Sequence, residues 1–332
     1  LLHLFPTWHD FYTLAANRYR DGLPTDNQLP HELGERMFAS QPIRRPAEEW
    51  LSSDRPPLQT GWQLLTWPAG KALGLDRRSM SGTSAVWFQL LWVAAAWGLL
   101  RTLRLEPKRA AGWVAALALT GFFVQNTVFT WPKLSAGAFT CGAFALLALP
   151  GAIGPVTRPR ALWAAFFAAL AWLSHGGVAF SFLALAPILA WQFLRRCGNS
   201  DCNLLGYSRV IRWRGWLAAA AIFAVLVLPW IAYQKFYEPP ANRLFKWHLA
   251  GHAAIDSRGT LETLRDSYAK IGWREIAENK LKNFQSQFYG DWSELFDLRH
   301  ETSAARRGHE FFHAGRALTW WPLLAIVALV LT

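Results

Sequence analysis

The sequence has few cysteines and none of the glycine-rich motifs that mark many soluble enzymes. It holds three cysteines, of which Cys141 lies in an apolar run and Cys197 and Cys202 lie in a polar connection. A C-x4-C pair with no further Cys or His close by gives little support to a zinc site. No internal repeat, P-loop, GxGxxG segment or GxSxG elbow occurs. These absences argue against the nucleotide-binding folds and serine hydrolases that such motifs identify.

Charge is missing from the interior of the long apolar runs. The chain is 52% hydrophobic and contains 20 Trp and 22 Phe. Trp gathers at the boundary between lipid and water in membrane proteins. Apolar runs long enough to cross a bilayer, or nearly so, occur at 84–103, 111–130, 134–150, 161–173, 178–194, 215–233 and 317–332. The pattern therefore predicts an all-α polytopic membrane protein.

The formal net charge of +12 is distributed unevenly along the chain. Residues 1–83 hold nine basic and nine acidic residues, and residues 234–316 hold thirteen and eleven. The remaining segments hold twelve basic and two acidic residues, and most of these cations lie in three short connections between apolar runs. Because the three connections alternate along the chain, they share one side, which the positive-inside rule identifies as the cytoplasm. A surface that binds nucleic acid would not alternate with membrane spans, so we expect no nucleic-acid partner.

This sidedness divides the chain into four parts. We expect residues 1–83 to form a first periplasmic loop with juxtamembrane helices, preceded by a first helix that lies largely before residue 1. Residues 84–233 are expected to form a six-helix transmembrane core, and residues 234–316 a large periplasmic loop. Residues 317–332 are expected to begin a further transmembrane helix. The predicted location is a bacterial inner membrane, with the site facing the periplasm.

Two segments on the outer side have helical patterns. Residues 58–74 include Pro68 and only a modest apolar run, so we interpret them as an interfacial helix anchored by Trp62 and Trp67. In the large loop, Leu261, Leu264, Tyr268 and Ile271 recur at helical spacing. We expect this amphipathic helix to lie against the outer face.

Several candidate site residues fall on the outer side. In "SSDRPPLQTGW", an acid and a base stand directly before two prolines, which favour an extended segment ahead of a new element. The candidates are Asp10 beside His9, Asp54 and Arg55 before the prolines, Lys133 in "FTWPKLS" and His175 in "LSHGGV". Two acids and several bases at one membrane face suit a lipid-linked phosphate and a reacting hydroxyl or amine.

The side chains themselves indicate the chemistry. Arginine presents a planar fork of donors that fits a phosphate or pyrophosphate. An aspartate such as Asp54 can hold a divalent cation, Mg²⁺ or Mn²⁺, or orient the arginine beside it. Simpler interpretations exist: Asp10 and Asp54 as helix caps, Lys133 as a cation reaching lipid headgroups, and His175 as a structural residue.

Three further polar residues lie in the large loop. Lys246, His248 and His252 follow one another in "ANRLFKWHLAGHAAID". Their side chains are of types that can contact an acceptor substrate. The alternative is that they are ordinary interfacial or loop residues.

The chain resembles the GT-C superfamily of membrane glycosyltransferases, and among them bacterial enzymes similar to protein O-mannosyltransferases and lipid A aminoarabinose transferases. Three features carry the resemblance: an acid after the first helix in "WHD", a charged pair before Pro-Pro-Leu in "DRPPL", and a large late outer loop at 234–316. Many relatives have a paired acid in the first loop, where this chain has His9 and Asp10. The resemblance implies a GT-C-like helix bundle with juxtamembrane helices in the first outer loop.

The resemblance also implies an activity. A sugar would pass from a polyprenyl-phosphate donor to an unidentified lipid, glycan or protein acceptor, with inversion at the anomeric carbon. By the same resemblance, Asp10 is the catalytic base or an acceptor-orienting residue, and Asp54 and Arg55 hold a metal or the lipid phosphate. The clustering on the outer face, not the resemblance, adds Lys133 and His175 as further phosphate contacts. The alternatives are a non-enzymatic transporter and a catalytically inactive scaffold or lipid-binding subunit. A transporter would place polar residues near the bilayer midplane, whereas the spans contain Gln89, Gln125 and Asn126 but no central charges.

Overall fold

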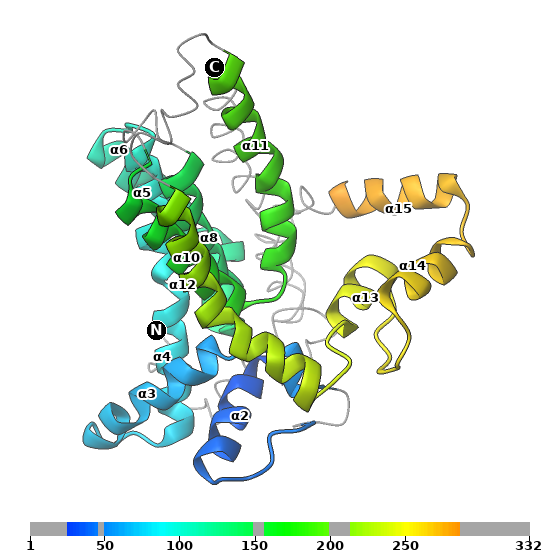
Figure 1. Ribbon diagram of the computed structural model, residues 1–332. Helices are drawn as coiled ribbons and strands as arrows, with labels where there is room; N and C mark the ends of the chain where they lie inside the picture. The colour runs from blue at the N-terminus through cyan, green and yellow to red at the C-terminus, as the bar shows by residue number, and fades with distance from the viewer. Residues whose placement is uncertain (1–24, 46–49, 149–155, 199–212, 286–332) are drawn as a thin grey trace, which may run out of the picture.

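The computed structural model describes residues 25–45, 50–148, 156–198 and 213–285. Within these ranges the chain forms helices and no strands, which confirms the predicted all-α class (Figure 1). The N-terminal part comprises η1 (Thr25–Gln28), α2 (Leu29–Phe38), η2 (Ser52–Asp54) and α3 (Leu58–Ala72). The central part comprises α4 (Arg77–Gln89), α5 (Leu91–Thr102), α6 (Pro107–Ala118), α7 (Gly121–Phe129), α8 (Lys133–Ala148), α10 (Arg158–Ser174), α11 (Val178–Gly198) and α12 (Trp213–Ala232). After it come the π-helical turn η3 (Tyr233–Tyr237), α13 (Arg243–Ala250), α14 (Thr260–Tyr268) and α15 (Trp273–Gln285).

Fewer of these helices satisfy the length of a membrane span than the sequence predicts. Two helical stretches are long and apolar enough to cross a membrane. Arg77–Thr102 comprises α4 and α5, and Arg214–Tyr237 comprises most of α12 together with η3. Pro107–Ala118 and Gly121–Phe129 would form a third span, but they are bent by 69° where they meet. Helices also occupy the other predicted runs of the core, but α10 has 17 residues and the apolar parts of α8 and α11 are shorter than a span. The described residues thus support a membrane protein with two or three spans by length and composition.

The central helices pack closely through small residues. α10 packs against both α8 and α12, and α8 also contacts α5. Buried alanines line α10 where it meets its neighbours: Ala161, Ala164, Ala169 and Ala171. On α8, a Cβ at Gly142 would lie 3.1 Å from the Phe167 ring, so a larger residue there would push α10 away. Small residues let helix backbones approach closely, which suits association in lipid as well as in water.

The helix predicted over 58–74 exists as α3, and the indole N–H groups of both its tryptophans bond to α4. Trp67 is buried, and its Nε1 donates a hydrogen bond to Ser81 Oγ at 2.7 Å. The Nε1 of half-buried Trp62 donates to the carbonyl of Ser84 at 2.8 Å. Because both acceptors lie on α4, the two indoles hold α3 against α4.

The late segment beyond α12 lies to one side of the helix bundle in Figure 1. The amphipathic helix expected from residue 261 is present as α14, which packs against α13. Tyr268 donates its hydroxyl proton to the carbonyl of Leu249 at 3.0 Å. Leu261, predicted on the packed face, is instead 82% exposed, and Thr263 is the buried residue of this helix.

Candidate functional site

Before the two prolines the chain turns through η2 and is then extended at Arg55, which agrees with the extended or turning segment that the sequence predicts. η2 ends at Asp54, and Arg55 has φ −118° and ψ 98°. α3 begins at Leu58, and its N-cap residue is Pro57. Asp54 therefore does not cap α3; its carboxylate instead accepts the backbone N–H of Leu51, as the third residue of a capping box on η2.

Residues far along the chain hold this segment in place. Glu238 is buried, and its carboxylate accepts hydrogen bonds from the Ser53 backbone N–H at 3.0 Å and from the Ser52 hydroxyl. The other Glu238 oxygen accepts from the backbone N–H of Arg45 at 2.7 Å. Gln234 Nε2 donates to the carbonyl of Ser53 at 2.9 Å. The end of α12 and the turn after it thus fix the backbone that leads to Arg55.

Asp54 forms a buried ion pair with Arg243 of α13. Arg243 Nη1 lies 2.6 Å from Asp54 Oδ2, and both side chains are about 95% buried or more. The same carboxylate oxygen accepts the backbone N–H of Leu51 at 3.2 Å. Burial raises the pKa of the Asp54 carboxyl above its ordinary value, although the adjacent guanidinium lowers it. The ion pair ties α13 to the first loop.

Cations and aromatic rings alternate along one wall of the site. Lys133 Nζ lies 3.7 Å from the centre of the Trp131 ring. The Arg55 guanidinium lies 5.5 Å from that ring and 4.3 Å from Trp50. Arg243 lies 5.0 Å from the Trp50 ring, so Trp50 stands between two guanidinium groups. Such contacts stabilise a cation without neutralising its charge.

A buried polar network places the turn that carries Trp131. Gln59 Nε2 donates to the carbonyl of Thr130 at 2.7 Å, and Thr130 has a left-handed backbone with φ 58°. Gln89 Nε2 donates to Gln59 Oε1 at 3.1 Å, and Gln89 Oε1 accepts the backbone N–H of Ser135 at 3.1 Å. Since Gln59 is the second residue of α3 and follows Arg55 by four positions, the network connects the turn to the start of the helix that follows that arginine.

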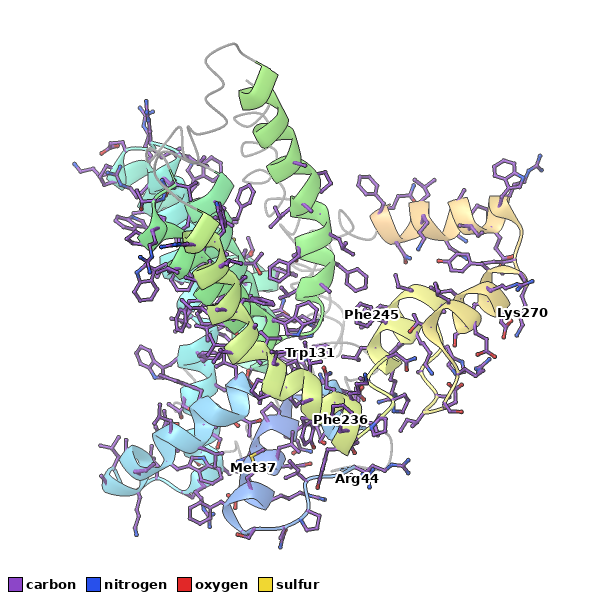
Figure 2. All side chains as sticks on the ribbon, in the orientation of Figure 1. Met37, Arg44, Trp131, Phe236, Phe245 and Lys270 are labelled. Atoms are coloured by element: carbon purple, nitrogen blue, oxygen red, sulfur yellow. The ribbon has the colours of Figure 1, made fainter. Side chains whose placement is uncertain are left out.

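These elements enclose a cavity of about 170 Å³. In Figure 2, Trp131 lies at the lower end of α10 and α11, and Phe245 lies on α13. The polar side chains that line the cavity include Ser53, Asp54, Arg55, Lys133, His175, Gln234 and His248. Its aromatic lining consists of Trp50, Trp131, Trp172, Phe180, Trp230, Phe245 and Trp247. Five residues selected from the sequence therefore meet in one cavity.

The two histidines in the lining have opposite tautomers. His175 Nδ1 accepts the Gly177 backbone N–H at 3.0 Å, so the proton of the neutral ring is on Nε2. Burial lowers the pKa of His175 to about 3, so the ring is a neutral donor at physiological pH. His248 Nδ1 lies 2.7 Å from the carbonyl of Leu244 and donates to it, so in the neutral ring Nε2 is a hydrogen-bond acceptor.

Other predicted residues lie away from this cavity or outside the described residues. Lys246 is fully buried and pairs with Asp256 at 2.5 Å, and it is not part of the lining. His252 Nε2 lies 2.7 Å from the same aspartate, so both residues stabilise the loop after α13. Asp10 and His9 lie outside the described residues.

A second, apolar cavity of about 280 Å³ adjoins the first. It lies among α2, α3, α10 and α12, and its lining includes Leu33, Met37, Leu173, Leu226 and Tyr233. Arg55 and Trp230 line both cavities, so the cationic site opens beside an apolar one.

The charges of the lining suit an anion better than a metal ion. Asp54 is the only carboxylate among the described lining residues, and Arg243 already pairs with it. In the ranges that the structure describes, no three His, Cys, Asp or Glu side chains are grouped as metal ligands. Arg55 and Lys133 add two positive charges that would repel a divalent cation. The described residues thus do not fit the predicted Mg²⁺ or Mn²⁺ site at Asp54.

The sequence interpretation missed Arg243 and Glu238. One signal was available, because no acidic residue occurs between Glu238 and Asp256, whereas Arg243 and Lys246 lie within that interval. Two cations in an acid-free stretch need partners from elsewhere if they are buried. The pairing of Arg243 with Asp54 required the tertiary structure.

No protein-family model, curated protein or solved structure matches this chain. The argument for function therefore depends on the cavity itself: its charge, its aromatic lining and the apolar cavity beside it.

Proposed function

We propose that this protein is a membrane glycosyltransferase that moves a sugar from a polyprenyl-phosphate donor to an acceptor at the periplasmic face of a bacterial inner membrane. The observation that carries the proposal is the meeting of Arg55, Lys133 and His175 in one aromatic cavity beside an apolar one. A lipid-linked phosphate has an anionic group that suits the first cavity and an apolar chain that suits the second.

The polar end of the donor fits the first cavity. Arg55 and Lys133 supply positive charge, and neutral His175 supplies an N–H donor on Nε2. Charge-assisted hydrogen bonds to phosphate oxygens are stronger than neutral ones, and a partly enclosed site reduces screening by water. The lining thus favours a phosphate over a neutral headgroup.

The apolar end of the donor fits the second cavity and the surrounding helices. Its lining is mostly aliphatic and aromatic, and it reaches Arg55 directly. Two helices of the described chain are long and apolar enough to lie in a membrane, where a polyprenyl chain resides. The sugar acceptor would approach along α13, where Nε2 of the neutral His248 ring can accept a hydrogen bond from its hydroxyl or amine.

The proposed reaction needs a leaving phosphate and a base. Arg55 and Lys133 stabilise the negative charge that develops on the phosphate as the bond to the anomeric carbon breaks. Asp10 takes the proton of the attacking hydroxyl or amine, and the attack from the opposite face inverts the anomeric carbon. The described residues do not form a metal site, so no step is assigned to a metal.

The first prediction tests the base. Asp10→Asn removes the proton acceptor, so transfer should fall by about 10²- to 10⁴-fold. The assay supplies membranes containing the variant with polyprenyl-phosphate sugar and measures product formation. Asp26→Asn is the matched control, because it makes the same change on the same predicted loop. Undiminished transfer by Asp10→Asn would contradict its role as base.

One observation favours a second candidate, a lipid-phosphate-binding subunit without turnover. The only carboxylate in the described lining, Asp54, is committed to Arg243 and is not available as a base. If the protein is such a subunit, it binds a polyprenyl phosphate but transfers no sugar. Turnover by the purified full chain separates the two candidates.

A further inference from the structure

Two polar groups in the cavity lining have no hydrogen-bond partner. Ser53 Oγ and Trp131 Nε1 are both buried, and neither finds a partner among the residues that the structure describes. Buried polar atoms in proteins nearly always have one, so each exception requires an explanation. Other such atoms, for example Trp92 Nε1, lie elsewhere in the described residues, but Ser53 and Trp131 line the same cavity as Arg55 and Lys133.

Ser53, whose hydroxyl has no partner among the described residues, lies in a segment whose backbone is held by hydrogen bonds. Its backbone N–H donates to Glu238 and its carbonyl accepts from Gln234, so both sides of the residue are fixed. The residue is 3% exposed. Its neighbour Ser52 is equally buried, but the Ser52 hydroxyl bonds to Glu238 and Tyr233. The two serines thus differ: the Ser52 hydroxyl is bonded within the fold, whereas Ser53 lines the cavity and its hydroxyl has no partner among the described residues.

The Trp131 ring is also held firmly. Lys133 and Arg55 lie over it, and Phe129 and His175 contact it with ring centres 5.7 and 6.1 Å away. An indole N–H can donate but cannot accept. A ligand that satisfies it must therefore present an acceptor atom beside the two cations.

We propose that the Ser53 hydroxyl and the Trp131 indole N–H are binding residues that donate hydrogen bonds to the oxygens of an anionic phosphate group in this cavity. A phosphate has several acceptor oxygens, so it can accept from Ser53, Trp131, Arg55 and Lys133 together. The inference rests on the proposed function and deepens it by naming the neutral donors of the phosphate site.

A ligand-binding role and a structural role of Ser53 and Trp131 predict different effects of their substitution on stability and on ligand affinity. Ser53→Ala removes an unsatisfied donor, so the melting temperature of the ligand-free chain should stay unchanged or rise by roughly 1–3 °C. Trp131→Phe also loses contacts of the indole ring with Lys133 and Arg55, so for this variant the binding affinity is the deciding measurement. The same variants should bind the ligand about 10- to 100-fold more weakly, as expected when a hydrogen bond to a charged group is lost. A purely structural role would lower stability and leave the ligand's affinity largely unchanged.

The test uses the full chain in detergent with farnesyl phosphate and farnesol as probes, measured by titration calorimetry. Ser52→Ala and Trp273→Phe are matched controls, since Ser52 is bonded within the fold and Trp273 is 74% exposed. We expect Ser52→Ala to lower the melting temperature. We expect Ser53→Ala and Trp131→Phe to weaken farnesyl phosphate binding while any farnesol binding is unchanged.

Three results separate the possible failures. If the wild-type chain binds farnesyl phosphate and both variants bind it equally well, the assignment of Ser53 and Trp131 is wrong and the proposed function stands. If Ser53→Ala destabilises the ligand-free chain as much as Ser52→Ala does, its hydroxyl is structural and the assignment is again wrong. If the wild-type chain binds farnesol as tightly as farnesyl phosphate, the phosphate site and the proposed function both fail.

Discussion

At the scale of single residues, burial changes the chemistry of several side chains that look ordinary in the sequence. His31 of α2 is buried, and its Nδ1 lies 3.0 Å from Ser81 Oγ on α4. Burial lowers the pKa of His31 to about 4, and Arg78 lowers it further while Asp76 opposes the shift. When the pH falls low enough for this histidine to be protonated in the unfolded chain but not in the folded one, the free energy of unfolding decreases.

This shift predicts a pH dependence of stability. Between about pH 6.5 and pH 4, the unfolded chain binds a proton at His31 that the folded chain does not, so the free energy of unfolding should fall by roughly 3 kcal/mol. The contribution is fully lost below the folded pKa of about 4. Denaturant unfolding of the full chain at several pH values measures it.

His31→Phe provides the comparison for that measurement. It keeps a ring against Trp67, whose centre lies 6.1 Å away, and removes the group that titrates. The variant should lose the part of the pH dependence that lies between about pH 6.5 and 4. Equal pH dependence in both proteins would show that other groups cause it.

At the scale of elements, α13 forms one wall of the cavity and is held by its first residue. α13 contributes Leu244, Phe245, Trp247 and His248 to the lining, while Arg243 faces Asp54. Arg243 also donates through Nε to the carbonyl of Ala253 at 2.8 Å. The ion pair therefore connects the first loop, α13 and the loop that follows it.

Removing one partner of this ion pair should lower the free energy of unfolding more than removing both partners together. Arg243→Met leaves Asp54 buried without its partner, at a cost of about 3–5 kcal/mol. The double variant Asp54→Leu with Arg243→Met removes both charges and should be more stable than Arg243→Met alone. Denaturant unfolding gives the free energies, and hydrogen exchange over residues 241–258 reports whether α13 opens.

The exposed Arg265 of α14 is the matched control for this series, since Arg265→Met removes the same charge without a buried partner. Its free energy of unfolding should change by less than about 0.5 kcal/mol. If Arg243→Met behaves like Arg265→Met, the pair does not hold α13 in place.

At the scale of the whole molecule, the proposal requires the first loop and the late segment to share one side of the membrane. In Figure 1, α2 lies near one end of the bundle, and α6 lies near the other. Arg77–Thr102 connects these ends and is long and apolar enough to cross a membrane. Residues before and after this helix should therefore face opposite compartments.

Thiol labelling tests this arrangement. In a variant without the three native cysteines, single cysteines replace the exposed residues Gln41, Lys270 and Lys108. A membrane-impermeant maleimide added to the periplasmic side should label positions 41 and 270 and leave 108 unlabelled until the membrane is permeabilised. Labelling of 41 and 270 from opposite sides would end the proposal of a shared site.

The sequence predicts some local features of the site well, because their causes are local. Two prolines exclude helix before them, so Arg55 had to be extended and α3 had to begin after it. The break between α6 and α7 and the inward-facing tryptophans of α3 were not predicted. Those features depend on which neighbouring helix offers an acceptor or a gap, and hydropathy does not contain that information.

The sequence by itself determined that this chain is helical and apolar, because composition and periodicity are properties of the chain alone. Only the tertiary structure decided that Asp54 pairs with Arg243, and that Ser53 and Trp131, which line the cavity, keep donors unbonded among the described residues. The physical reason is that a buried polar group is defined by its partner, and these partners lie up to 189 residues away.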